Sequence, residues 1–363
     1  MGRERNQPIR VDAIERYLTR IGFVKPRVLS LQPLGQDAQE GRKDYGYGRP
    51  LRVTVRSDAG ERTLVLRTMS PDPFGHDRRA DRADAMVLSF DTFNDLPHHI
   101  RALHLGAFDD EDEMWSVESG EFFLLTDYVE GELYAHLLAE SARAAHASDS
   151  DRSRVSALAH YLATLHIQRR PAAAYARHLR DTLGSGEGIF GLCDSYPSDC
   201  SEAPPERLRE IERLAVDWRW KMKAMSHRSR STHGDFHPFN LLFRDVDDFT
   251  VLDRSRGGVG DPADDVVCLA INFLFFALDQ RGAFDGAMRD LWHHFFASYL
   301  AETGDRELLS VVAPYFAWRG LVLASPLWYP NLDSAVRARL LTLVERLLAG
   351  AAFDPDRVDE VLS

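Results

Sequence analysis

Residues 231–265 hold most of the side chains in this sequence that could do chemistry. The segment reads STHGDFHPFNLLFRDVDDFTVLDRSRGGVGDPADD, with two short apolar runs at Leu241–Phe243 and Thr250–Leu252. Two such runs separated by a short polar stretch predict a β-hairpin. A protein core gains nothing from so many polar groups, because burying a charge is costly unless the charge is paired. The side chains that can take a proton or bind a metal are His233, Asp235, His237, Asn240, Asp253, Asp261 and Asp265.

Three of these side chains suit the transfer of a phosphoryl group from ATP to a hydroxyl. Catalysis of that reaction consists mostly of positioning and of cations held against the phosphates. A carboxylate must orient the hydroxyl and accept its proton, and carboxylate or amide oxygens must hold Mg²⁺. Asp235 and Asn240 lie five residues apart on a predicted loop, and Asp253 follows the second strand. A loop–strand–turn–strand path would bring all three to one end of the hairpin.

The surrounding motifs resemble those of the aminoglycoside phosphotransferase and choline kinase family. The motifs are His-Gly-Asp-Phe-His-Pro-Phe-Asn at 233–240, Val-Leu-Asp at 251–253 and Gly-Asp-Pro-Ala-Asp-Asp at 260–265. The segment 121–132 is similar to the family's hinge strand, and LAHYLATLH at 158–166 is similar to a helix of its larger lobe. The resemblance implies the protein-kinase-like fold.

The same resemblance implies roles for individual residues. Asp235 would be the catalytic base, and Asn240 and Asp253 would be the Mg²⁺ ligands. The adenine of ATP would hydrogen-bond the backbone near Asp127 and Val129. The acceptor would be a hydroxyl of a small molecule, which could be aminoglycoside-like, an amino alcohol, a sugar or another natural product.

Other polar residues of the segment are expected to support the loop. Asp261 followed by Pro262 is typical of a helix N-cap with proline at the first helical position. By the resemblance, Asp265 would brace the catalytic loop without reacting. His233 is expected to hydrogen-bond the loop, because Asp235 is better placed to act as the base. His237 suits Mg²⁺ poorly as a ligand, because imidazole prefers softer metals.

The N-terminal part departs from the family pattern. The position that usually carries a phosphate-binding lysine is Arg67, a permanent cation whose planar guanidinium has a different reach. The helix predicted at 77–93 contains no glutamate, so we place Asp84 beside Arg67 as its ion-pair partner. The segment 35–48 contains four glycines but no GxGxxG. Arg67 is therefore predicted to contact phosphate within an unusual nucleotide clamp.

The predicted elements divide into a β-rich N-terminal part and a helical remainder. Strands are predicted at 28–34, 51–57, 61–68, 103–108 and 121–126, with helices at 11–22 and 77–93. Further helices are predicted at 133–140, 152–168, 204–225, 264–279, 283–303, 306–322 and 334–348. We expect an α+β, protein-kinase-like two-lobed fold. It would have a small antiparallel-sheet N-lobe at 1–126, a hinge at 127–131 and a larger, mostly helical C-lobe at 132–363.

Two features keep alternative interpretations open. The glycine-rich stretch 181–200 could shape an acceptor pocket, with Glu187 and Asp194 as contacts, or it could be a tight connection between helices. Arg254 and Arg256 could contact phosphates, or they could pair with the carboxylates that follow them.

Composition narrows the class of partner. The net charge of −12 argues against a nucleic-acid-binding protein, which would normally carry a basic face. The three cysteines form no CxxC pair, so they indicate neither a disulfide framework nor a zinc site. The start of the chain lacks an apolar signal, and the longest apolar run, 266–278, is too short to span a bilayer. We expect a cytoplasmic monomer or homodimer that binds a small molecule and neither nucleic acid nor membrane.

The sequence therefore predicts an ATP- and Mg²⁺-dependent phosphotransferase. One alternative is a kinase-like regulator that binds nucleotide without catalysing transfer, which the unusual N-terminal part suggests. Another is a metal hydrolase that uses His233, Asp235 and His237 around a transition metal.

Overall fold

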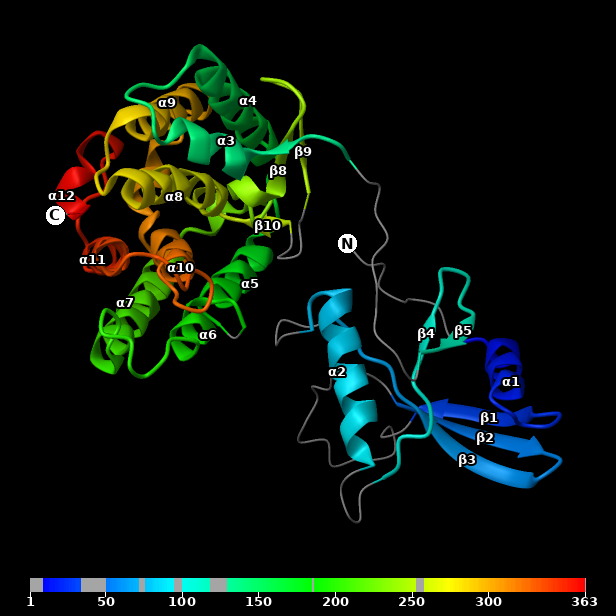
Figure 1. The fold of residues 1–363 in the computed structure, drawn as a ribbon. Coiled ribbons are helices and arrows are strands. Elements are labelled where there is room, and N and C mark those ends of the chain that lie inside the picture. The colour runs from blue at the N-terminus through cyan, green and yellow to red at the C-terminus, as the bar shows by residue number, and fades with distance from the viewer. Residues whose placement is uncertain are drawn as a thin grey trace. The chain divides into compact units, whose positions relative to one another are not determined.

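The computed structural model describes residues 9–33, 50–71, 76–94, 100–117, 129–184, 186–252 and 258–362. The chain divides into two compact units, Met1–Thr126 and Asp127–Ser363 (Figure 1). Each unit has its own hydrophobic core.

The first unit contains a three-stranded antiparallel sheet with the order β1-β2-β3. Its strands are β1 (Arg27–Pro33), β2 (Leu51–Ser57) and β3 (Gly60–Leu66). The β2–β3 connection is the predicted hairpin turn. Gly60 has a φ of +105°, a conformation that favours glycine because other residues place a Cβ against the backbone there.

The core of the first unit lies between this sheet and one amphipathic helix. The helix is α1 (Val11–Arg20), and it buries Ile14, Tyr17 and Leu18. These side chains cluster with Val53 and Val55 of β2 and with Met114. The spacing of the buried positions is the helical periodicity that the sequence carries.

Two short strands and a second helix complete the described part of the first unit. The helix is α2 (Arg79–Phe93), and β4 (Gly106–Phe108) pairs antiparallel with β5 (Met114–Ser116). The sequence did not predict β5, because three residues are too few to display an alternating pattern. The strand predicted at 121–126 and the glycine-containing segment 35–48 lie outside the described residues.

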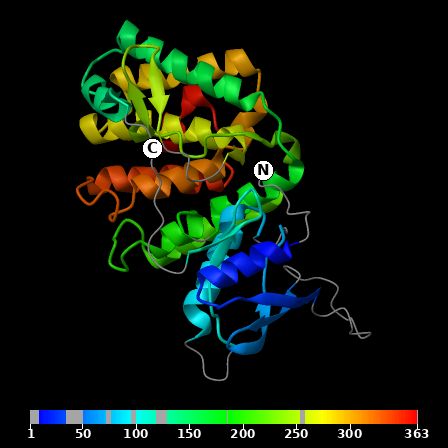
Figure 2. The same ribbon diagram turned by 90° about the vertical axis from the view of Figure 1, so that its right-hand side faces the viewer.

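The second unit is mostly helical and is organised around one buried helix, α8 (Pro262–Arg281). Every residue of α8 from Pro262 to Leu278 is buried, and other helices enclose it (Figure 2). The other helices are α3 (Tyr134–Ser141), α4 (Asp149–His166), α5 (Ala172–Leu183), α6 (Ile189–Asp194), α7 (Pro205–Met222), α9 (Gly286–Thr303), α10 (Ala313–Leu323), α11 (Ser334–Leu348) and α12 (Asp359–Leu362).

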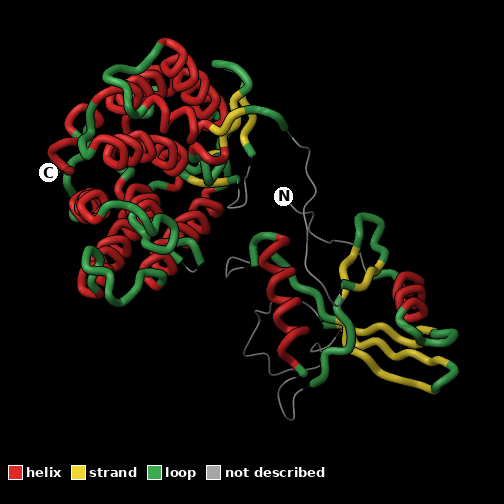
Figure 3. Tube along the Cα trace, viewed as in Figure 1, coloured by secondary structure: helices red, strands yellow, loops and turns green. Residues whose placement is uncertain are grey.

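Short strands gather at one edge of the second unit (Figure 3). The strands β8 (Leu241–Phe243) and β9 (Phe249–Val251) form the predicted hairpin, and β6 (Glu132–Leu133) extends it along β8. A separate antiparallel pair joins β7 (Arg230–Ser231) to β10 (Val259–Gly260). These two small sheets flank the loop between β7 and β8.

The glycine-rich stretch contains a helix that the sequence did not predict. Helix α5 ends at Leu183, and α6 begins at Ile189. A Cβ on Gly191 would lie 1.9 Å from the carbonyl oxygen of Gly186, and one on Gly188 would lie 2.8 Å from that of Gly184. The glycines therefore permit a tight connection between two helices, and their density hid α6.

The single helix predicted at 306–322 is wrong. A 3₁₀ helix covers Arg306–Ser310, and α10 starts separately at Ala313. Pro314 lies in the first turn of α10, where its missing N–H costs no hydrogen bond. Proline there favours a new helix start and disfavours a helix that continues through it.

Candidate active site

The loop between β7 and β8 is anchored to the buried helix α8 by one carboxylate. Asp265 accepts hydrogen bonds from the backbone N–H groups of His233 and Gly234, each at 2.7 Å. Gly234 has a φ of +88°, so glycine suits the turn that presents both N–H groups. Asp265 is fully buried and braces the loop as the sequence predicted.

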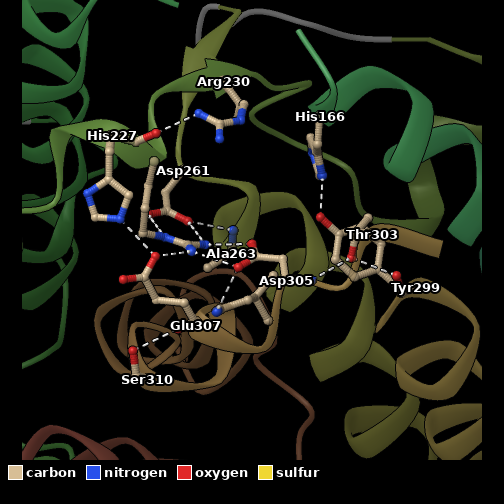
Figure 4. A network of polar contacts seen from close by, with 12 residues as sticks. His166, His227, Arg230, Asp261, Ala263, Tyr299, Thr303, Asp305, Glu307 and Ser310 are labelled. Atoms are coloured by element: carbon tan, nitrogen blue, oxygen red, sulfur yellow. Dashed lines mark hydrogen bonds and ion pairs between the residues drawn. The ribbon is translucent and has the colours of Figure 1, made fainter. Parts of the chain in front are cut away.

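Asp265 keeps its charge inside the core through its hydrogen bonds. Burial disfavours the charged form. Hydrogen bonds from His166 and from the backbone of the loop outweigh it, so the pKa of Asp265 lies below its ordinary value. His166 contacts Asp265 through Nε2 at 3.1 Å. Its Nδ1 contacts the hydroxyl of Tyr299 at 2.7 Å (Figure 4). The brace thus extends from α8 to α4 and α9.

The two carboxylate oxygens of Asp235 have different neighbours. Oδ1 accepts a hydrogen bond from Nη1 of Arg319 at 2.8 Å. Oδ2 lies 3.3 Å from Nδ2 of Asn240 and 3.5 Å from Nε2 of His237. The backbone N–H of Asp235 donates to Nδ1 of His233 at 3.2 Å, which is the loop contact expected of that histidine. Asp235 and Asn240, predicted to act together, therefore lie in direct contact.

Arg319 is a site residue that sequence reasoning missed. It lies on α10, 84 residues after Asp235, and only 5% of its surface is exposed. Its Nη2 donates to the carbonyl oxygen of Gly234 at 2.8 Å and to Oδ1 of Asp264 at 2.7 Å. A lone arginine in the apolar helix sequence APYFAWRGLVL was the signal, because a charge buried in such a helix needs a partner.

Charge in this cluster is balanced by pairing. Burial raises the pKa of the Asp264 carboxyl, and Arg319 opposes that rise. Burial also disfavours the charge of Arg319, but the negative groups around it outweigh burial and raise its pKa. The Arg319 guanidinium therefore stays charged between Asp235 and Asp264.

The amide of Asn240 is oriented by Asp235. Its Nδ2 donates to the carbonyl oxygen of Asp235 at 3.0 Å, so its second polar atom, Oδ1, points elsewhere. Among the described residues, none donates a hydrogen bond to this oxygen. An uncommitted amide oxygen beside a carboxylate is the donor chemistry that Mg²⁺ prefers. The backbone N–H of Leu252 donates to the carbonyl oxygen of Asn240 at 2.9 Å, which ties the end of the hairpin to the loop.

Some predicted site residues lie where their contacts are not described. Asp253 belongs to the segment 253–257, and Asp127 to the segment 118–128, both outside the described residues. Val129 is the first described residue after the latter segment and is half-buried. Arg67 directly follows β3, and Asp84 lies on α2; both are exposed residues of the first unit. The Arg67–Asp84 pair stays a prediction.

Asp261 has a structural role at the start of α8. Its Oδ1 accepts a hydrogen bond from the backbone N–H of Ala263 at 3.0 Å, which confirms the predicted N-cap. Arg228 binds the same carboxylate through Nε at 2.8 Å and Nη2 at 2.9 Å. Arg228 also contacts Asp305 and Glu307, so a polar network extends from the buried Asp261 to these more exposed carboxylates (Figure 4).

The two histidines of the loop accept hydrogen bonds from its backbone. Nδ1 of His233 accepts from Asp235, and Nδ1 of His237 accepts the N–H of Phe239 at 3.2 Å. Within the described ranges, no three His, Cys, Asp or Glu side chains gather so that they could hold a metal. No helix in that part of the chain is both long and apolar enough to cross a membrane.

The chain combines a small antiparallel-sheet unit with a mostly helical unit that carries the loop of Asp235 and Asn240, which is an α+β class. The chain belongs to the phosphotransferase enzyme family, whose model matches residues 50–307. The match covers Arg67, the hairpin and the loop of Asp235. The resemblance, the fold class and the prediction of a small-molecule kinase are thereby confirmed.

Solved structures similar to this chain have low sequence identity to it. A type I macrolide 2′-phosphotransferase is 16% identical, with 94% of this chain and 97% of that chain covered and a TM-score of 0.30. An aminoglycoside phosphotransferase from Streptomyces rimosus, in complex with ADP and streptomycin, is 18% identical, with coverage of 74% and 90% and a TM-score of 0.37. A choline kinase from Streptococcus pneumoniae is 11% identical, with coverage of 97% and 98% and a TM-score of 0.32. No curated protein sequence matches the chain.

Proposed function

We propose that this protein transfers the γ-phosphoryl group of ATP to a hydroxyl of a small molecule in a Mg²⁺-dependent reaction. The observation that carries the proposal is the contact between Asp235 and Asn240 on a loop held by Asp265. Membership of the phosphotransferase family supports it, because the matched region contains this loop.

Asp235 is the catalytic base in this proposal. Its carboxylate orients the acceptor hydroxyl and accepts its proton as the oxygen attacks the γ-phosphorus. Buried neighbours and a backbone fixed by Asp265 keep the carboxylate in one place, which lowers the entropic part of the barrier. Asp235 is only 7% exposed, which limits the access of water to its carboxylate in competition with the acceptor hydroxyl.

Asn240 and Asp253 are the proposed Mg²⁺ ligands. The fit rests on the amide oxygen of Asn240, which no described side chain engages, and on the carboxylate of Asp253, which follows Leu252 in the chain. Bound Mg²⁺ would neutralise charge on the phosphates. In the first unit, Arg67 would contact phosphate with Asp84 as its partner. The adenine would bind the backbone near Asp127 and Val129.

The test is a phosphate-transfer screen. Purified protein is incubated with ATP and Mg²⁺ and with a panel that contains streptomycin, kanamycin, erythromycin, choline, ethanolamine and simple sugars. Mass spectrometry then detects the addition of one phosphoryl group. We expect one class of hydroxyl compound to be phosphorylated.

Asp235→Asn is the decisive variant for the catalytic assignment. The amide cannot accept the proton as a carboxylate does, so we expect transfer to fall by about 10²–10⁴-fold. Binding of ATP, measured by calorimetry, should persist, because the variant removes no proposed nucleotide contact. Turnover by Asp235→Asn at the wild-type rate would refute the assignment of Asp235 as the base.

Nucleotide binding without any transfer or ATP turnover would favour the alternative of a kinase-like regulator, which the unusual N-terminal part of the sequence suggests. The hydrolase alternative predicts a bound transition metal, which elemental analysis detects. The loop histidines accept backbone hydrogen bonds through Nδ1, and this use of their ring nitrogens disfavours it.

A further inference from the structure

The two oxygens of the Asp235 carboxylate face different surroundings. Arg319, whose side chain is 6% exposed, binds Oδ1. His237, whose side chain is 30% exposed, lies on the side of Oδ2 together with the partly exposed Asn240. Oδ1 is therefore turned toward the interior, and Oδ2 is turned toward the accessible side of the loop.

Arg319 is itself fixed by contacts that do not involve Asp235. Asp264 and the carbonyl oxygen of Gly234 hold Nη2, and the guanidinium lies over the ring of Trp318 at 3.9 Å. Because Asp264 belongs to the first turn of α8 and Gly234 to the loop, the guanidinium joins three elements. It reaches Asp235 from a position set by these elements.

The orientation of the Arg319 guanidinium is not the one that would satisfy all of its own N–H groups. Its Nε is buried and has no hydrogen-bond partner in the part of the chain that the structure describes. Buried donors are normally satisfied, so an orientation that leaves one unpaired is held by something else. The contacts of Nη2 with Asp264 and Gly234 hold the guanidinium, and Nη1 contacts only Asp235 among the described residues.

We propose that Arg319 is a positioning residue for phosphoryl transfer, which holds Oδ1 of Asp235 so that Oδ2 is presented to the acceptor hydroxyl. This inference rests on the proposed function of Asp235 as the base. In the transfer, the acceptor oxygen forms a bond to the γ-phosphorus and its proton moves to Oδ2. The bond from phosphorus to the bridging oxygen breaks, with its electron pair leaving on ADP.

Without Arg319, the Asp235 carboxylate could rotate about its terminal torsion, which is broad for an sp³–sp² bond. A rotated carboxylate still binds substrate but is out of line with the hydroxyl. A misplacement of about 1 Å can cost about 100-fold in rate. The loss should therefore fall on kcat and leave KM for ATP and acceptor nearly unchanged.

The first experiment compares Arg319→Gln and Arg319→Lys with wild type. The rate measured is Mg²⁺-dependent formation of ADP with the panel compound that gives the fastest turnover, or with water alone. We expect Arg319→Gln to lose about 100-fold in kcat. Arg319→Lys should recover part of that loss, because it keeps the charge but not the fork. If Arg319→Gln does not fold, Arg319→Lys provides the test. We expect its kcat to fall while its KM values stay near those of the wild type, and an unchanged kcat would overturn the inference.

Arg337→Gln is the matched control. Arg337 is equally buried, at 5% exposure, but it lies on α11 and donates to backbone carbonyl oxygens, among them those of Ala324 and Tyr329. Loss of this arginine should lower the melting temperature without changing kcat. A similar fall in kcat for Arg337→Gln would show that any buried arginine matters to the rate and would overturn the inference.

A double-mutant comparison separates positioning from general stability. In the Asp235→Asn background, Arg319→Gln should slow the residual rate no further, because the carboxylate it positions is gone. It should also lower the melting temperature less than it does in wild type. Additive losses in both rate and melting temperature would overturn the inference.

The inference and the proposed function fail in different ways. Full activity of Asp235→Asn would refute the assignment of Asp235 as the base, and the proposed function would fail with it. If Asp235→Asn is inactive and Arg319→Gln keeps the wild-type kcat, Asp235 stays assigned as the base and only the positioning role of Arg319 is refuted.

Discussion

Asp235 and Asp265 are both buried carboxylates of one site, but their partners differ in kind. Asp265 accepts two backbone N–H groups and contacts His166, so its charge fixes the shape of the loop. Asp235 is held at Oδ1 by Arg319, and the described contacts of Oδ2 are longer. At the residue scale, the carboxylate that binds two backbone N–H groups is the scaffold. The carboxylate whose two oxygens have different surroundings is the one proposed to react.

Asp265→Asn tests the scaffold. An amide offers one oxygen where two N–H groups converge, so one backbone donor is left facing an NH₂ group. Breaking such a buried charged network should cost about 3–5 kcal/mol in the free energy of unfolding. The measurement is urea-induced unfolding at neutral pH. A loss below about 1 kcal/mol, the range of exposed pairs, would contradict the role of Asp265 as the anchor of the loop.

The same variant has a pH dependence with a defined sign. The pKa of Asp265 in the folded state lies below that of an unfolded aspartate, about 3.9. Its stabilising effect is therefore present above about pH 3.9 and is lost as the pH falls through the folded-state pKa. The stability difference between wild type and Asp265→Asn should narrow in that acidic range and stay constant above it.

At the element scale, the first turn of α8 organises the second unit. The N-cap and two acids of this turn each contact a different segment: Asp261 contacts Arg228, Asp264 contacts Arg319, and Asp265 contacts the loop. A helix N-terminus favours negative charge, because its unpaired N–H groups and dipole are positive. The Asp-Pro-Ala-Asp-Asp motif therefore starts the helix and also binds three other parts of the second unit to it.

Asp261→Ala should be more destabilising than the loss of a helix cap alone. It removes the N-cap of α8 and takes from the buried Arg228 its buried carboxylate partner, although Asp305 still binds the same guanidinium, so we expect about 2–4 kcal/mol in the free energy of unfolding. Asp333→Ala is the matched control, because Asp333 caps α11 at an exposed position. That variant should cost about 1 kcal/mol. Equal losses in chemical denaturation would contradict the extra role of Asp261.

Local signals in the sequence predict many of the helices and strands. They do not predict contacts between side chains that are far apart in the sequence. The hairpin of β8 and β9 and the start of α8 follow from apolar runs and from Asp261-Pro262, which are signals within a few residues. The contact of Arg319 with Asp235 depends on how α10 packs near α8, which no local pattern encodes. Helix α6 was missed because its glycines serve a close approach of backbones, while glycine ordinarily indicates a loop.

At the scale of the whole molecule, the described residues form two hydrophobic clusters of very different size, one in each unit. The core of the first unit centres on Val53 and Val55 of β2 and on α1. That of the second extends from α3 to α12 around α8. The described contacts of the loop between β7 and β8, the one with Arg319 included, lie wholly within the second unit. Stability in one core should therefore be separable from stability in the other.

Val55→Ala tests this separation. Val55 is 1% exposed, so truncation leaves a cavity that should cost about 2 kcal/mol in the first unit. Amide hydrogen exchange should then speed up in β1, β2 and β3, because local opening there becomes more frequent. Exchange in α8 and α10 should stay at the wild-type rate. Leu274→Ala, at a fully buried position of α8, should produce the reverse pattern. Equal acceleration in both units from either substitution would mean that the two cores unfold as one cooperative body.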